Sequence, residues 1–175
     1  MKKYLLTGEK VGLREISPDD INEKYCAWLN DLEVNKYMQS RYSPWNLDKM
    51  KQYLSNLGSY EYIFAICCLE SDEHIGNIKL GPIDWINRKA EISILLGEKC
   101  SWGKGYGTEA VCLISQYALA TLSLNKVTAG CYIDNIGSAN IVLKNGFVKE
   151  GVLLNEFAYE GGYTDAIRFG KTRTK

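Results

Sequence analysis

Three glycines at alternate positions, placed just before a segment that reads as a helix, constrain this chain more than any other feature. The stretch is CSWGKGYGTEA, Cys100 to Ala110, with glycine at 103, 105 and 107. Ordering glycine costs more conformational entropy than ordering any other residue, so three within five residues predict a backbone that bends sharply or lies close against another group. The first four amides of a helix lack internal partners and carry the positive end of its dipole. The stretch therefore predicts an anion-binding turn between a strand and a helix.

Two familiar phosphate-binding loops do not fit this stretch. A Walker A loop needs a glycine, four residues and then Gly-Lys-Ser/Thr, and GKGYGTE lacks that order. A dinucleotide fingerprint needs G-x-G-x-x-G near the first strand, whereas the spacing here is G-x-G-x-G and the loop lies past the middle of the chain. A different kind of phosphate site is therefore expected.

Apolar periodicity predicts an α/β chain built around a mixed sheet. Alternating apolar and polar residues predict strands, and apolar residues spaced by three and four predict helices. The resulting order is β-α-α-β-β-β-α-β-α-β-β. Ser17 is expected to cap the first helix, with Pro18 at its first position. The expected strands cover 11–16, 60–69, 74–83, 89–97, 126–133 and the two arms of 151–173, which turn at Glu160–Gly162, and the expected helices cover 17–29, 46–58, about 108–122 and 138–146.

Charge and residue counts exclude several classes of protein. The 175 residues suit a single domain, residues 1–175. With 21 basic and 21 acidic residues the chain lacks the basic excess of a nucleic-acid binder. No apolar run approaches the length of a membrane span, and Leu5–Leu6 is too short for the core of a signal peptide. The six cysteines form no C-x-x-C pair and His74 is the single histidine, so we expect no metal site and a reduced, cytoplasmic protein.

Two motifs together resemble the GNAT acetyltransferase superfamily. WGKGYG, residues 102–107, is similar to its acyl-CoA pyrophosphate loop, Gln/Arg-x-x-Gly-x-Gly/Ala, with Trp102 where Gln or Arg is commoner. NIGSANIVLKNGF, residues 135–147, is similar to the N-x-x-S…K-x-G-F pattern of the RimJ/RimL-like branch. The resemblance covers residues 11–171. It implies a GNAT-like domain with a mixed central sheet of six to seven strands, about four flanking helices, and a V-shaped splay between the two central strands.

The resemblance also implies how acetyl-CoA would be held. Its diphosphate would sit on the amides of the glycine loop, and its pantetheine arm would run along the preceding strand as an extra strand would. Asn135 would bond the arm or its thioester end, unless it only makes its own turn. The residues that the resemblance assigns to acetyl-CoA are Leu95, Leu96, Gly97, Trp102, Gly103, Lys104, Gly105, Tyr106, Gly107, Thr108 and Asn135.

Acetyl transfer to an amine favours a base, because only the unprotonated amine attacks. At pH 7 deprotonation costs about 4.6 kcal/mol for an amine of pKa near 10.4 and about 1 kcal/mol for an α-amine near 7.8. Glu91 lies in the otherwise apolar strand before the loop and resembles the family's usual base position. The alternative is a strand carboxylate paired with Arg88 or Lys89.

A second group would protonate the leaving thiolate. Many relatives use a tyrosine four residues before the Gly of Gly-Phe, where this chain has Val142. The resemblance to RimJ/RimL-like members gives that role to Ser138, and the alternative is that Ser138 caps the short helix.

The amine acceptor itself is left open by the sequence. A protein N-terminal amine and a small-molecule amine are the first options, and GPIDWINR, residues 81–88, resembles members that acetylate amino-sugar nucleotides. The balanced charge gives a polyamine acceptor little support. A non-catalytic acyl-CoA-binding sensor is the alternative from another class, against which Glu91, Asn135 and Ser138 argue. The family habit of pairing through C-terminal strands makes a homodimer a further option.

Overall fold

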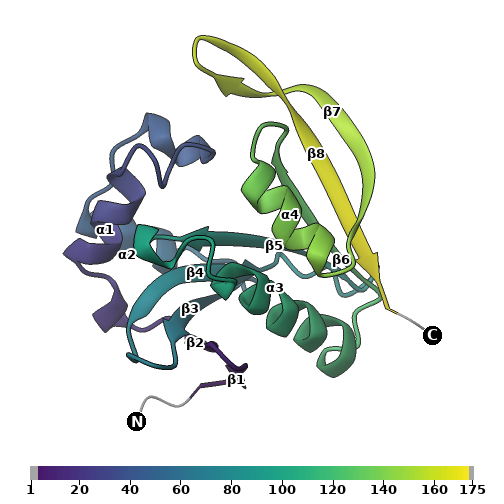
Figure 1. The fold of residues 1–175 in the computed structure, drawn as a ribbon, viewed down its shortest axis with the longest axis horizontal. Helices are drawn as coiled ribbons and strands as arrows, with labels where there is room; N and C mark the ends of the chain where they lie inside the picture. Colours follow the sequence, from purple (N-terminus) through teal and green to yellow (C-terminus); the bar gives the residue numbers. More distant parts are fainter. Residues whose placement is uncertain (1–3, 174–175) are drawn as a thin grey trace.

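The chain folds around one eight-stranded sheet in the order β1-β2-β3-β4-β5-β6-β8-β7, seen in a computed structural model that describes residues 4–173 (Figure 1). The strands are antiparallel except where β5 meets β6. The strands are β1 (Leu6–Thr7), β2 (Val11–Glu15), β3 (Tyr62–Cys68), β4 (His74–Leu80), β5 (Lys89–Leu96), β6 (Lys126–Tyr132), β7 (Val148–Tyr159) and β8 (Gly162–Thr172), and the α-helices are α1 (Glu23–Asn30), α2 (Leu47–Ser55), α3 (Tyr106–Gln116) and α4 (Ile136–Lys144).

The expected α/β order is confirmed, and the structure adds one short strand. The two residues of β1 pair with β2, which raises the strand number above the expected six to seven. The expected start of the first helix is wrong, because Pro18–Asp20 forms a separate 3-10 turn behind Ser17. Helix α1 begins after Asn22, whose side-chain oxygen accepts from the Tyr25 amide at 3.1 Å.

The expected splay in the centre of the sheet is confirmed by the register. Strands β5 and β6 pair in parallel only from Lys89↔Lys126 to Glu91↔Thr128. Beyond that point no residue of β5 pairs with a residue of β6, although β5 continues to Leu96 and β6 to Tyr132. The edges of the two strands therefore open toward the glycine loop.

Each face of the sheet carries its own hydrophobic cluster. Ala90 and Ile92 on β5 pack with the buried α3 residues Val111 and Ile114. The opposite face carries α1 and α2, whose buried residues are Tyr25, Trp28, Leu29 and Met50, with Leu95 of β5 packed against them. Burying one such side chain contributes about 1.5–3 kcal/mol, so these two layers fix the helices on the two sides of the splay.

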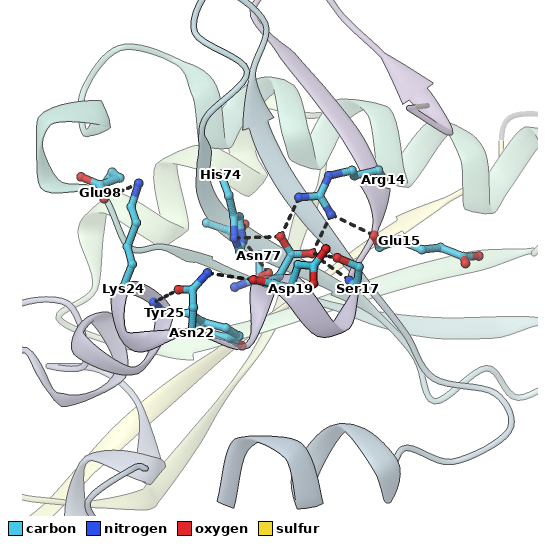
Figure 2. A network of polar contacts seen from close by, with 12 residues as sticks. Arg14, Glu15, Ser17, Asp19, Asn22, Lys24, Tyr25, His74, Asn77 and Glu98 are labelled. Carbon is cyan, nitrogen blue, oxygen red and sulfur yellow. Dashed lines mark hydrogen bonds and ion pairs between the residues drawn. The ribbon is translucent and has the colours of Figure 1, made fainter. Parts of the chain in front are cut away.

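A buried ion pair anchors the turn that leads into α1 (Figure 2). Both Arg14 guanidinium nitrogens donate to Asp20, Nη1 to Oδ2 and Nη2 to Oδ1, each at 2.6 Å. The Ser17 amide also donates to Asp20, at 2.7 Å. Burial acts to raise the pKa of the Asp20 carboxyl, but the bonds from Arg14 and Ser17 outweigh it and hold that pKa well below its usual range.

The described residues include no helix long and apolar enough to cross a membrane. Among the same residues, no three His, Cys, Asp or Glu side chains gather where they could hold a metal ion.

Candidate functional site

The three glycines of the loop are there for two different structural reasons. Gly103 and Gly105 have φ values of 73° and 89°, in the left-handed region that residues with a Cβ rarely adopt. Gly107 lies inside the first turn of α3 and is small for a packing reason. A Cβ there would lie 3.1 Å from the terminal methyls of both Ile141 and Leu96. The first two glycines shape the turn, and the third lets α3 lie close to β5 and α4.

The turn leaves a row of backbone donors at the start of α3. Gly105 is the N-cap and Tyr106 to Thr108 are the first three helical residues. Within residues 4–173, the amides of Gly105 to Thr108 donate to no backbone or side-chain acceptor, and the first amide of the helix that is bonded is that of Glu109. No atom lies within 4 Å of the position that a Cβ would take on Gly103, so the turn is open on that side. Unpartnered amides, the helix dipole and open space together fit a diphosphate.

Lysine 10 adds a positive charge to the same turn. Its ammonium donates to the Lys104 carbonyl at 3.1 Å and lies beside Gly105. Lys10 was not predicted from the sequence, because it precedes Lys104 of the loop by 94 residues and only the fold brings the two together. Lys104 itself is exposed and is the second cation of the loop.

Glu109 in the first turn of α3 fixes the loop against the beginning of β2. Its carboxylate accepts from the backbone amides of Glu9, Lys10 and Val11, each at 2.8 Å. Asn145, at the end of α4, donates to the Thr108 carbonyl at 3.0 Å. These bonds hold the start of α3 from two sides and preorganise its free amides.

The backbone direction of β5 shows which of its residues are bonded to β4. The carbonyl of Glu91 accepts from Gly81 and the amide of Gly97 donates to Ile75, at 2.9 and 3.0 Å, so odd-numbered residues of this segment bond toward β4. Leu95 is therefore engaged with Asn77 in the ladder. The amides of Leu95 and Gly97 therefore point toward β4, and binding of the arm by backbone groups near Leu95 to Gly97 stays a prediction in which Leu96 offers the free edge.

The backbone amides and carbonyls of the even-numbered residues of β5 point toward the splay instead. The Thr128 hydroxyl on β6 donates to the Ala90 carbonyl, so that carbonyl points toward β6. The backbone groups of Ile92, Ile94 and Leu96 point the same way, at a period of two. The Trp102 indole donates to the Leu96 carbonyl at 3.0 Å, so Trp102 braces the loop against the strand end. Ile94 was missed from the sequence, because alternation shows which residues share a face but not which edge their amides point to.

Glu91 lies where the splay begins and is held by one partner. Its Oε2 accepts from Arg168 Nη1 on β8 at 3.0 Å, and the two side chains are 44% and 41% exposed. Oε1 has no hydrogen-bond partner among residues 4–173. Neither Arg88 nor Lys89, the partners considered from the sequence, pairs with Glu91. Arg168 was missed, because nothing in the sequence indicates that β8 lies across β6 from β5.

The start of α4 shows which of two residues caps this helix. Asn135 is the N-cap, and its Oδ1 accepts from the Ser138 amide at 3.1 Å. The alternative in which Ser138 caps this helix is therefore wrong, since Ser138 is the third helical residue. Its hydroxyl and the Asn135 Nδ2 have no partner in the described part of the chain, and both residues line the cleft described next.

A cleft of about 550 Å³ lies between the open face of the sheet and the segment from α1 to α2. Glu91, Ser93 and Leu95 of β5 form part of its floor with Tyr132 of β6. Residues of the α1–α2 segment on its other side include Tyr25, Leu29, Tyr37, Met38, Ser40, Trp45, Met50 and Tyr53. The exposed residues Trp85, Asn87 and Arg88, considered from the sequence for an amino-sugar nucleotide, do not line this cleft.

Comparison with known proteins gives a family match over most of the chain. The family model described as Acetyltransferase (GNAT) domain matches residues 10–148. An uncharacterized N-acetyltransferase p20 of Bacillus licheniformis is 32% identical over 170 residues, 92% of each chain. The ribosomal-protein-serine acetyltransferase of Escherichia coli K12 is 34% identical over 113 residues, 64% of this chain and 61% of the other. A crystal structure of spermidine N-acetyltransferase from Vibrio cholerae in complex with CoA and spermine superposes with a TM-score of 0.85 at 22% identity, covering 95% and 97% of the two chains. The last likeness concerns the fold alone.

Proposed function

This chain belongs to the GNAT acetyltransferase family, and on that basis we propose that it transfers acetyl from acetyl-CoA to a primary amine by direct attack. The observation that carries the proposal is the row of unpartnered amides from Gly105 to Thr108, beside the Lys10 ammonium and next to a splayed strand edge. A diphosphate with an amide-rich tail matches this arrangement of donors better than a simple phosphate does.

Acetyl-CoA would supply the reacting thioester carbonyl. On the protein side, the amides of Gly105 to Thr108 would bind the diphosphate, with Lys10 and Lys104 adding positive charge. The amides of Ile94 and Leu96 would bond the pantetheine arm at the free edge of β5. The Asn135 Nδ2, which the cap leaves free, would be the donor to the arm from the β6 side.

Glu91 is the proposed base. The free Oε1 would take the proton from the amine, directly or through one water, as the amine nitrogen forms its bond to the acetyl carbon. Arg168 on Oε2 would fix the rotamer of the carboxylate. The Ser138 hydroxyl is proposed to give a proton to the departing sulfur, a smaller demand because a thiol of pKa near 8.5 is already a fair leaving group.

The acceptor proposed here is a protein N-terminal amine or a small-molecule amine. The experiment incubates the protein with acetyl-CoA and a mixed library of peptides, small amines and amino-sugar nucleotides, and identifies acetylated products by mass spectrometry. Acetylated amine with stoichiometric release of CoA is the expected result. CoA bound in calorimetry with no acetylated product would favour the acyl-CoA sensor and would contradict the proposal.

A further inference from the structure

The carbonyl of Leu96, at the free edge of β5, already has a partner from the glycine loop. Leu96 is the last residue of β5. The Trp102 indole Nε1 donates to its carbonyl at 3.0 Å. A free strand edge offers N–H and C=O groups to whatever binds as an extra strand, and the indole can only donate. The Trp102 N–H therefore takes the place on this carbonyl that an N–H of the pantetheine arm would take.

The Trp102 side chain can leave this position without disturbing the core. It is 41% exposed, and among the described residues neither hydrophobic cluster includes it. The next residue, Gly103, has a left-handed φ of 73° and no atom within 4 Å of the position that a Cβ would take. The loop therefore has open space beside the tryptophan.

We infer that Trp102 occupies the free edge of β5 until the pantetheine arm displaces it, and this inference rests on the proposed function. The indole N–H leaves the Leu96 carbonyl as an N–H of the arm bonds to it, so one hydrogen bond is lost there for each one made. An arm without a diphosphate gains little from this exchange. CoA gains in addition the bonds of its diphosphate to the amides of Gly105 to Thr108.

The exchange has a consequence for donor specificity. It raises the Kd of CoA and the Kd of pantetheine by the same factor, because both ligands carry the same arm. The diphosphate compensates for that loss, and pantetheine has nothing that does so. Trp102 thereby holds thioesters of pantetheine alone at low occupancy, and the chain uses thioesters of a diphosphate carrier.

Replacing the indole with a ring that cannot donate tests the exchange. Trp102→Phe should tighten the binding of CoA and of pantetheine equally, by about 2- to 12-fold, the factor that corresponds to a net hydrogen bond of about 0.5–1.5 kcal/mol. Calorimetry gives the Kd for CoA, and a titration followed by NMR gives the Kd for pantetheine. Trp85→Phe is the matched control, because Trp85 is 45% exposed and precedes the other end of β5. It should change neither Kd.

The indole N–H signals of the four tryptophans give a second readout, which a purely structural role of Trp102 would not move. The signal that is missing from the spectrum of Trp102→Phe belongs to Trp102. Saturating pantetheine should shift this signal and remove its protection from hydrogen exchange. The Trp85 signal should keep its position.

Three results would overturn the inference while leaving amine acetylation in place. Weaker CoA binding in Trp102→Phe with pantetheine unchanged would mean that Trp102 only braces the loop. Unchanged Kd values for both ligands would mean that the Leu96 carbonyl accepts from the arm and the indole together. A Trp102 signal that bound pantetheine does not move would mean that the indole is not displaced.

The proposed function fails in a different way. Bound CoA with no amine acetylated, together with tighter binding of both ligands in Trp102→Phe, would support the inference and overturn the transfer. An unaltered protein that binds no CoA would overturn the two together.

Discussion

Replacing Gly105 with alanine should weaken CoA binding by about 5- to 30-fold. Gly105 has a φ of 89°, and the left-handed region costs a residue with a Cβ about 1–2 kcal/mol. The new Cβ would lie 3.6 Å from the Lys10 ammonium, an ordinary contact, so backbone strain rather than collision sets the size of the effect. Because 1.4 kcal/mol is a factor of ten, this strain converts to about 5- to 30-fold if the loop must keep its shape to bind the diphosphate.

Titration calorimetry with two ligands checks this reasoning. CoA carries the diphosphate, whereas pantetheine has only the arm, so Gly105→Ala should weaken CoA binding and leave pantetheine binding unchanged. Gly151→Ala is the matched control, because Gly151 has no left-handed φ and no atom within 4 Å of its added Cβ. Equal losses for CoA and pantetheine, or no loss for CoA, would refute the role of the loop.

Glu91→Gln should lower kcat at least tenfold and leave the Kd for CoA unchanged, because an amide cannot take the amine's proton. Steady-state kinetics measures the first and calorimetry the second. Unaltered turnover would remove Glu91 from the mechanism. The depressed pKa of Asp20 means that its pairing with Arg14 stabilises the fold fully above the unfolded pKa near 3.9 and is lost as pH falls below it. Urea unfolding should therefore show a free energy of unfolding that falls from about pH 6 to pH 3. If the free energy falls equally steeply with pH in Asp20→Asn, Asp20 is not the cause. Glu109→Ala should lower the free energy of unfolding by about 1–3 kcal/mol, because three backbone amides lose a charged acceptor. An unchanged urea midpoint would show that this anchor is not needed.

The order of helices and strands was predictable because each long element carries a clear period. Strand β1 was not, since two residues show no period and exist as a strand only by pairing with β2. The Arg14–Asp20 pair was also invisible, because an arginine in a strand and an aspartate in a turn read as surface residues until the fold buries both.

The candidate site was likewise predictable only in part. Gly103 and Gly105 made the turn predictable, because the backbone there has left-handed φ values, which favour glycine. The partners of Glu91 and of the loop were not predictable. Arg168 reaches Glu91 through the order of β5, β6 and β8, and Lys10 reaches the loop through the first hairpin. Local chemistry was readable in the sequence, and contacts set by sheet order and register were not.

The proposed function requires that the start of α3 binds the diphosphate of a thioester carrier whose arm enters the splay of the sheet. A crystal structure of the protein with CoA measures this directly. We expect diphosphate oxygens about 3 Å from the amides of Gly105 to Thr108, with the sulfur between β5 and β6 on the side of Glu91. A diphosphate bound elsewhere, or an arm outside the splay, would contradict it.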